Sequence, residues 1–84
     1  MSYTIKWEKV AFLFLDKLSS NVSERILNKL DKIKKDPFHY LEHFESKKCY
    51  KLGIGIYRAL IDVDFENKVL IIQILDKRGR IYKR

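Results

Sequence analysis

Hydrophobic and polar positions follow two different periods along the chain, and the change of period divides it into two halves. Residues 3–7 alternate strictly between apolar and polar, which predicts a short, half-buried strand. From Glu8 the apolar residues recur three and four positions apart, which predicts a helix as far as about Leu18. A second helix, apolar on one side and basic on the other, follows the break at 19–21 and ends before Pro37.

The second half carries runs of β-branched and aromatic residues that are broken by Gly or by an Asp/Asn turn, a pattern typical of strands. It predicts strands at about 48–54, 56–63 and 68–75, and a short one at 80–83. The run 68–75 is apolar at both parities except for Gln73, so we expect it to be the central strand, covered on both faces. The segment 38–46 has no clear period and is predicted to be a loop, with room for one helical turn.

The resulting fold class is α+β, in the order β-α-α-β-β-β with an optional final strand. A two-helix hairpin is expected to pack on one face of a small, mostly antiparallel, twisted sheet. The 84 residues fit a single domain spanning 1–84. The chain has no apolar run of about 18 residues and no signal-peptide pattern, and it has a single cysteine, so we expect a cytoplasmic protein without a membrane partner.

Positive charge is concentrated in the strand-rich half. The net charge is +7; residues 1–46 hold 8 Lys/Arg against 7 Asp/Glu, whereas residues 47–84 hold 10 against 4. Such a distribution indicates a basic face that binds nucleic acid or another acidic surface. A surface selected only for solubility accounts for the composition equally well.

Strand parity places two cations on a common face. In the strand at 56–63, Arg58 points away from the apolar residues that form the core face, and in the preceding strand Lys51 does the same. Both are therefore expected on the face away from the helices. Arg78 and Tyr82 belong to the final segment, whose position across that face the pattern does not fix.

The order of elements, with Tyr50-Lys51-Leu52, then Gly55-Ile56-Tyr57-Arg58, then Arg78 to Tyr82, resembles the RelE/ParE superfamily of bacterial and archaeal toxins. The resemblance spans essentially the whole chain. It implies a type II toxin of the RelE kind, an endoribonuclease that cleaves mRNA in the ribosomal A site and inhibits translation. It also implies that neither a metal nor another cofactor is needed, because the 2′-hydroxyl of the RNA attacks the neighbouring phosphate.

The resemblance also assigns roles and partners. Lys51 would activate the hydroxyl, Arg58 would stabilise the phosphorane, Arg78 would serve the leaving oxygen, and Tyr82 would stack on a base. Further cations would steer RNA and ribosome to the site: Lys47, Lys48, Lys77, Arg80, Lys83 and Arg84. The partners implied are the ribosome, its mRNA and a cognate RelB-like antitoxin, with which the toxin would form a heterotetramer.

Two positions depart from the family pattern and keep alternatives open. Gly53 stands where RelE-type members usually carry a second cation, and Ile56 stands where a polar residue is common. Losing one transition-state contact lowers a rate by roughly 10²–10³-fold, so these departures imply a nuclease activity that is weak or absent. The alternatives are a ParE-like or catalytically impaired toxin that acts by binding a protein such as gyrase, and a non-catalytic RNA-binding module. His39 and His43 lack a third ligand in sequence, and no metal site is expected.

Overall fold

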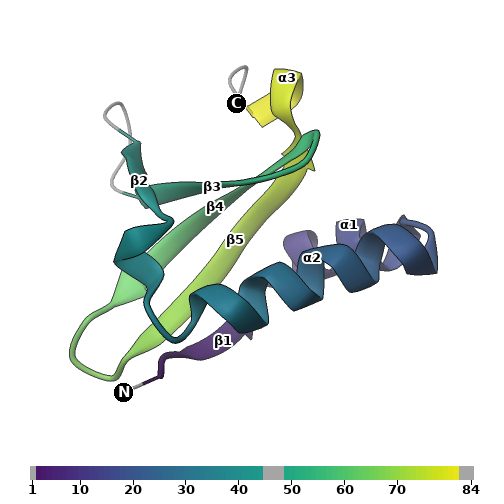
Figure 1. The fold of residues 1–84 in the computed structure, drawn as a ribbon. Helices are drawn as coiled ribbons and strands as arrows, with labels where there is room; N and C mark the ends of the chain where they lie inside the picture. Colours follow the sequence, from purple (N-terminus) through teal and green to yellow (C-terminus); the bar gives the residue numbers. More distant parts are fainter. Residues whose placement is uncertain (1, 45–48, 82–84) are drawn as a thin grey trace.

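The structure is a computed structural model that describes residues 2–44 and 49–81. Its elements follow one another as β1 (Thr4–Trp7), α1 (Lys9–Lys17), α2 (Ser20–Ile33), the 3₁₀ turn η1 (Pro37–His39), β2 (Glu42–Phe44), β3 (Cys49–Ile54), β4 (Tyr57–Asp64), β5 (Val69–Lys77) and α3 (Arg78–Ile81) (Figure 1). The five strands form one sheet in the order β1-β5-β4-β3-β2, in which only the β1–β5 pair is parallel. The predicted α+β class and mostly antiparallel sheet are confirmed.

Both long helices cover one face of the sheet, as the sequence predicts. Apolar side chains of α1 and α2 are buried against alternate residues of β3, β4 and β5. The centre of this core is made of residues that expose at most 2% of their surface: Ala11, Ile26, Leu30, Ile33, Leu52, Ala59, Ile61, Leu70, Ile72 and Leu75. Burial of each larger side chain contributes about 1.5–3 kcal/mol to the free energy of unfolding. The packing of the helices on this face therefore stabilises the sheet.

An irregularity in β5 explains why its apolar pattern has no single parity. Leu60 pairs with Ile74 but the next residue, Ile61, pairs with Ile72, which leaves Gln73 as an extra residue in β5. Ile72 and Leu75 can therefore both face the helices although they are three residues apart. The middle strand of the five is β4 and not β5, so that part of the prediction was wrong. β5 is nevertheless an inner strand, between β1 and β4.

Two further elements differ from the prediction. Residues 42–44 are an edge strand, β2, within the segment predicted to be a loop. At the other end, residues 78–81 form α3 where we expected a strand beginning at residue 80. The backbone N–H of Arg78 donates to the carbonyl of Ile56 at 2.9 Å, and the chain then turns away from the ladder. Ile81 is fully buried, so this position is apolar because its side chain packs in the core and not because it belongs to a strand.

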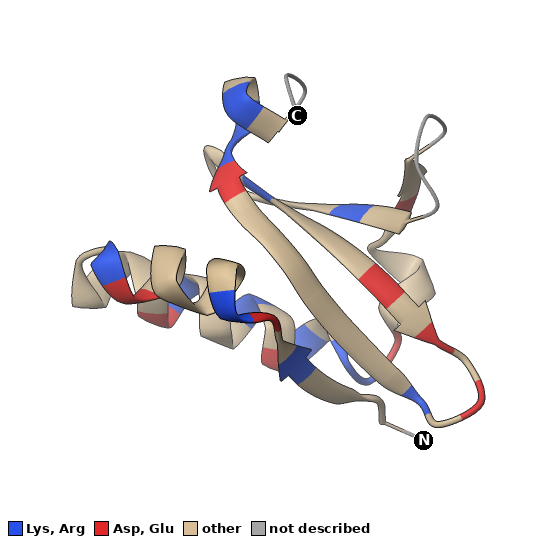
Figure 2. Cartoon of the chain, turned by 180° about the vertical axis from the view of Figure 1, so that it is seen from behind, with Lys and Arg blue, Asp and Glu red and all other residues tan. Residues whose placement is uncertain are grey.

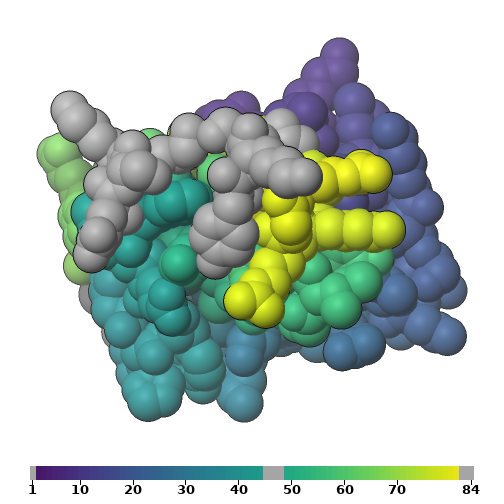
Figure 3. All heavy atoms as spheres, turned by 90° about the horizontal axis from the view of Figure 1, so that it is seen from above, coloured from purple at the N-terminus to yellow at the C-terminus, as the bar shows by residue number. Residues whose placement is uncertain are grey.

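Because of α3, the face away from the helices is not open along its whole length. Ile81 packs on a second, smaller core with these residues: Phe44, Cys49, Leu60 and Ile74. The end of this face nearest the β3–β4 turn is consequently bordered by α3 (Figure 3). None of the helices in the described part of the chain is both long and apolar enough to cross a membrane.

The β4–β5 turn is fixed by a side chain and contains one strained residue. The carboxylate of Asp64 accepts hydrogen bonds from the backbone N–H and the side-chain amide of Asn67, at 3.0 and 2.9 Å. These bonds hold the pKa of Asp64 below its usual value. Lys68 then adopts a φ of 59°, in the left-handed region that favours glycine.

The left-handed residue gives a stability prediction. Lys68→Gly is expected to exceed Lys68→Ala in free energy of unfolding by about 1 kcal/mol, because only alanine retains the clash of a Cβ with its own backbone. Both variants lose the contact of the Lys68 ammonium with the Tyr3 ring, 5.4 Å from its centroid, so the comparison isolates the backbone term. Urea unfolding of the two variants measures the difference. Equal midpoints would contradict the backbone conformation described for this turn.

Candidate nucleic-acid interface

Strand pairing brings Lys51 and Arg58 to the same face. In the β3–β4 ladder Lys51 lies opposite Leu60, and Gly53 lies opposite Arg58. Lys51 and Arg58 are therefore diagonal neighbours, a separation that long side chains can bridge. Both are half-buried. The predicted sharing of one face is confirmed for this pair.

Arg78 joins them from α3. Asp76 pairs with Arg58 across β4 and β5, so the residues just after it lie beside the start of β4. A polar hollow of about 300 Å³ lies at this corner, and its lining residues are Tyr40, Glu42, Lys51, Gly53, Arg58 and Arg78. We refer to it as the anion pocket. Cations from three separate elements, β3, β4 and α3, line this pocket. Figure 2 marks the Lys and Arg positions along the chain in blue.

The guanidinium of Arg58 is held in a defined orientation. Its Nη1 donates to the carbonyl oxygens of Gly55 at 2.8 Å and Tyr57 at 2.7 Å. Its Nε and Nη2 donate to no acceptor among the described residues. A Cβ on Gly53 would lie 3.2 Å from both Cζ and Nη1 of Arg58, so the planar group lies directly over the glycine backbone. An arginine fixed in this way presents its remaining N–H groups to a phosphate with little loss of side-chain entropy.

Lys51 occupies a mixed environment within the same pocket. Its ammonium lies 3.6 Å from the Glu42 carboxylate, across the β2–β3 pair, and 5.5 Å from the ring centroid of Phe44. The Glu42 side chain is 75% exposed, and an ion pair this accessible to water is worth about 0–1 kcal/mol. A phosphate can therefore compete with Glu42 for the lysine.

Glu42 is predicted to oppose anion binding in this pocket. Glu42→Gln is expected to tighten the binding of a short single-stranded RNA by about two- to fivefold, which corresponds to removal of a weak competing ion pair. Fluorescence anisotropy at low salt measures the affinity. Glu66→Gln removes the same charge from the β4–β5 turn and serves as the control. Equal or weaker binding by the Glu42 variant relative to this control would contradict the arrangement.

Asp76 is a buried carboxylate beside the pocket that sequence reasoning did not single out. It exposes 3% of its surface, and its Oδ1 accepts the backbone N–H of Lys77 at 2.8 Å. This bond lies at the junction of β5 and α3, directly before Arg78. Asp76 therefore helps to fix the point at which the chain leaves the sheet.

The remaining predicted residues are distributed differently. Lys77 pairs with Tyr57 and so lies on the opposite parity from Arg58, outside the anion pocket. Arg80 lines a separate hollow together with residues of α1 and Ile74. The others lie outside the described residues: Lys47, Lys48, Tyr82, Lys83 and Arg84. Within residues 2–44 and 49–81, no group of three or more His, Cys, Asp or Glu side chains could hold a metal ion.

The sequence analysis missed two lining residues, Tyr40 and Glu42. Both lie in the segment that we predicted to be a loop, because its apolar and polar residues follow no clear period. Glu42 begins β2, and it pairs with Lys51 across β2 and β3. Tyr40 directly follows η1.

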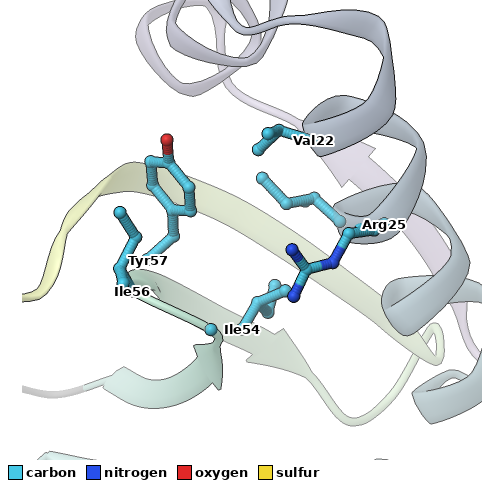
Figure 4. Close-up of a pocket in the computed structure, with 7 residues that line it drawn as sticks. Val22, Arg25, Ile54, Ile56 and Tyr57 are labelled. Atoms are coloured by element: carbon cyan, nitrogen blue, oxygen red, sulfur yellow. The ribbon is translucent and has the colours of Figure 1, made fainter.

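An apolar hollow lies on the other side of the β3–β4 turn. It has a volume of about 290 Å³ between α2 and the turn, and Val22, Ile54 and Tyr57 are among the side chains that line it (Figure 4). Ile56, one of the two departures from the family pattern, is 63% exposed at its rim. Ile56 is therefore at the surface of the turn, and it does not line the anion pocket.

Comparison with known proteins gives matches in structure alone. No protein-family model and no curated protein sequence matches the chain. Among solved structures, the archaeal RelE–RelB complex from Pyrococcus horikoshii matches with a TM-score of 0.79 and 26% identity, over 95% of this chain and 99% of that one. The chain has the fold of the RelE-like toxin superfamily.

Two further structures with the RelE fold agree. A double arginine-to-alanine mutant of the Escherichia coli toxin RelE, in the free state, matches with a TM-score of 0.74 and 25% identity, over 99% of this chain and 93% of that one. The toxin–antitoxin complex RelBE2 from Mycobacterium tuberculosis matches in fold with a TM-score of 0.84 and 21% identity, over 93% and 100%. The RelE fold thus accounts for nearly the full length of the chain.

Proposed function

We propose that this protein is the toxin of a type II toxin–antitoxin pair, a RelE-like endoribonuclease that cleaves mRNA in the ribosomal A site and inhibits translation. The observation that carries the proposal is the convergence of Lys51, Arg58 and Arg78 on one polar pocket within a RelE fold. Three cations around a hollow of this size suit a phosphodiester, whose negative charge increases as a pentacoordinate phosphorane forms.

The proposed reaction uses the RNA's own nucleophile. The 2′-oxygen attacks the adjacent phosphorus and loses its proton, the bond to the 5′-oxygen breaks, and that oxygen leaves as a hydroxyl. The products are a 2′,3′-cyclic phosphate and a 5′-hydroxyl end, with no redox change and no metal ion. Lys51 orients and activates the 2′-hydroxyl, and Arg78 stabilises the leaving oxygen.

Arg58 has the central part in this mechanism. The two carbonyl bonds engage Nη1 and leave Nε and Nη2 to bind the substrate, in the planar arrangement that matches two phosphate oxygens. Since these groups are already oriented before the reaction, they stabilise the phosphorane without further reorganisation. Tyr82, which follows α3, stacks on a base and contributes roughly 1–3 kcal/mol to binding.

We further propose a cognate RelB-like antitoxin as partner in the cytoplasm, bound as a toxin–antitoxin heterotetramer. Support comes from the matched structures, several of which are complexes of RelE with RelB. The sheet ends in two edge strands, β1 and β2, to which an extended partner segment can add through main-chain hydrogen bonds. The net charge of +7 favours an acidic partner.

A ParE-like action on gyrase is the second candidate, because Gly53 replaces a cation that RelE-type members usually carry. Inducing the protein in cells, while following amino-acid incorporation and plasmid supercoiling, separates the two. We expect incorporation to stop within minutes with supercoiling unchanged, and co-expression of the antitoxin to restore growth. Loss of supercoiling with translation intact would favour the gyrase target and reject the nuclease.

A further inference from the structure

A second hollow adjoins the anion pocket and shares Gly53 with it. It has a volume of about 390 Å³ and lies between α2 and the end of β3. Its lining residues are Arg25, Asn28, Lys29 and Lys32 from α2, and Gly53, Ile54 and Gly55 from β3 and the following turn. We call this hollow the α2 groove. Three of its four helical side chains are cationic, and no described residue that lines it carries a carboxylate.

The cations of the α2 groove form one stripe of the helix. Positions 25, 29 and 32 are four and three residues apart, so they lie on the same side of α2. Asp31 lies elsewhere: it pairs with Lys34 at 2.7 Å, which lowers its pKa, and it lines a different hollow beside β1. Over residues 2–44 and 49–81, none of the three groove cations forms an ion pair. Their charge is thus available to a ligand.

The α2 groove and the anion pocket meet at Gly53, which lines both, so together they form one path along the surface. The guanidinium of Arg58 lies over this glycine, at the junction. Tyr40, a wall of the anion pocket, has the ammonium groups of Lys29 and Lys32 at 4.9 and 5.9 Å from its ring centroid. The pairing of β2 with β3 stops at Lys51, so the groove runs beside an unpaired stretch of strand edge.

Arg25 extends the path beyond the end of the strand. Its side chain reaches from α2 towards Ile54 and the β3–β4 turn (Figure 4). A Cβ on Gly55 would lie 3.4 Å from its Nη2. From Arg25 to Lys32 the helix rises by about 10 Å.

We propose that the α2 groove binds the phosphates of the RNA strand as it continues out of the anion pocket. The inference rests on the proposed function, which places the reacting phosphate in that pocket. Cations repeated over about 10 Å suit a chain of regularly spaced anions, about three nucleotides at roughly 3.4 Å per stacked step.

The test compares two charge-matched triple variants. Arg25→Gln/Lys29→Gln/Lys32→Gln empties the α2 groove of charge, and Lys6→Gln/Lys9→Gln/Lys35→Gln removes three exposed cations elsewhere. The probe is a 2′-O-methyl single strand of about eight nucleotides, which covers both hollows and cannot be cleaved. We expect the groove variant to reduce the slope of log K against log [salt] by about 2, and the control by less than about 0.7. With a trinucleotide, the groove variant should bind as wild type does.

Several outcomes would overturn the assignment. They are equal losses in the two triple variants, no binding of the strand by the wild type at low salt, or groove-dependent binding of an acidic polypeptide in place of RNA. The nuclease proposal is tested separately, by cleavage of an RNA that retains its 2′-hydroxyl groups. Binding that depends on the groove without any cleavage would reject the chemistry and leave the groove assignment standing.

Discussion

Arg58→Ala is expected to lower the rate of RNA cleavage by about 10²–10³-fold while the protein stays folded. The reason is geometric: the side chain lies on the pocket face of β4, and its Nη1 is held by two carbonyl oxygens so that the remaining N–H groups are oriented in advance. Removal of this arginine takes away the group that meets the developing charge on phosphorus. Single-turnover cleavage of mRNA on purified ribosomes measures the effect.

Two companion variants separate chemistry from charge. Arg58→Lys keeps the positive charge but not the planar pair of donors, and it should recover only part of the rate. Lys6→Ala removes an exposed cation from β1, on the opposite edge of the sheet from β2, and should cleave as fast as wild type. If Arg58→Ala also retained the wild-type rate, the assignment of the pocket would be wrong.

Gly53→Val is expected to lower the cleavage rate by about 10²-fold without lowering the free energy of unfolding. A Cβ at this position would approach Cζ of Arg58 to 3.2 Å, and two further methyl groups force the guanidinium off its carbonyl acceptors. A shift of about 1 Å in a positioned group costs about this much. Valine suits a strand better than glycine, so stability is expected to stay level or rise.

A loss of rate without a loss of stability separates the position of Arg58 from unfolding. Rate is followed by single-turnover cleavage and stability by urea unfolding, on the same preparation. Gly79→Ala, whose added Cβ meets nothing within 4 Å, is the matched control and should leave the rate unchanged. A Gly53→Val enzyme with full activity would show that Arg58 does not depend on the absence of a side chain at position 53.

Gly53 also bears on the departure from the family pattern. In this chain the glycine is the surface over which Arg58 lies, and it lies where the anion pocket and the α2 groove meet. The loss of one cation at position 53 is therefore accompanied by a defined position for another. This arrangement is a physical reason to expect chemistry from a pocket with three cations.

The elements with regular periodicity were predictable from sequence. The helices α1 and α2 and the strand β3 bury one face, and burial imposes the periods of 3.6 and 2 that the sequence displays. β5 was predicted from its continuous apolar run. Short elements were not predictable in this way. β2 is three residues long, and the four residues of α3 are defined by the burial of Ile81 in a contact between distant parts of the chain.

The same distinction applies to the site. Strand parity was sufficient to place Lys51 and Arg58 on one face, because alternation in a strand is a local property. Arg78 reaches the pocket only because the chain leaves the sheet after Lys77, and no periodic pattern in the sequence predicts this turn. The position of Glu42 depends on β2, and that of Tyr40 depends on the η1 turn before it. The bulge at Gln73 changes which residues of β5 face the helices. It lies within an apolar run, so the sequence pattern does not distinguish the two faces there.

The central claim is that the three cations of the anion pocket promote attack of the RNA's own 2′-hydroxyl. The most direct measurement is the chemistry of the RNA ends that form when the purified protein acts on ribosome-bound mRNA. The buffer contains a chelator at a concentration below that of the Mg²⁺ that the ribosomes need. The account predicts a 2′,3′-cyclic phosphate and a 5′-hydroxyl end, formed by wild type and absent in Arg58→Ala. A 5′-phosphate end, or intact mRNA with the wild type, would contradict it.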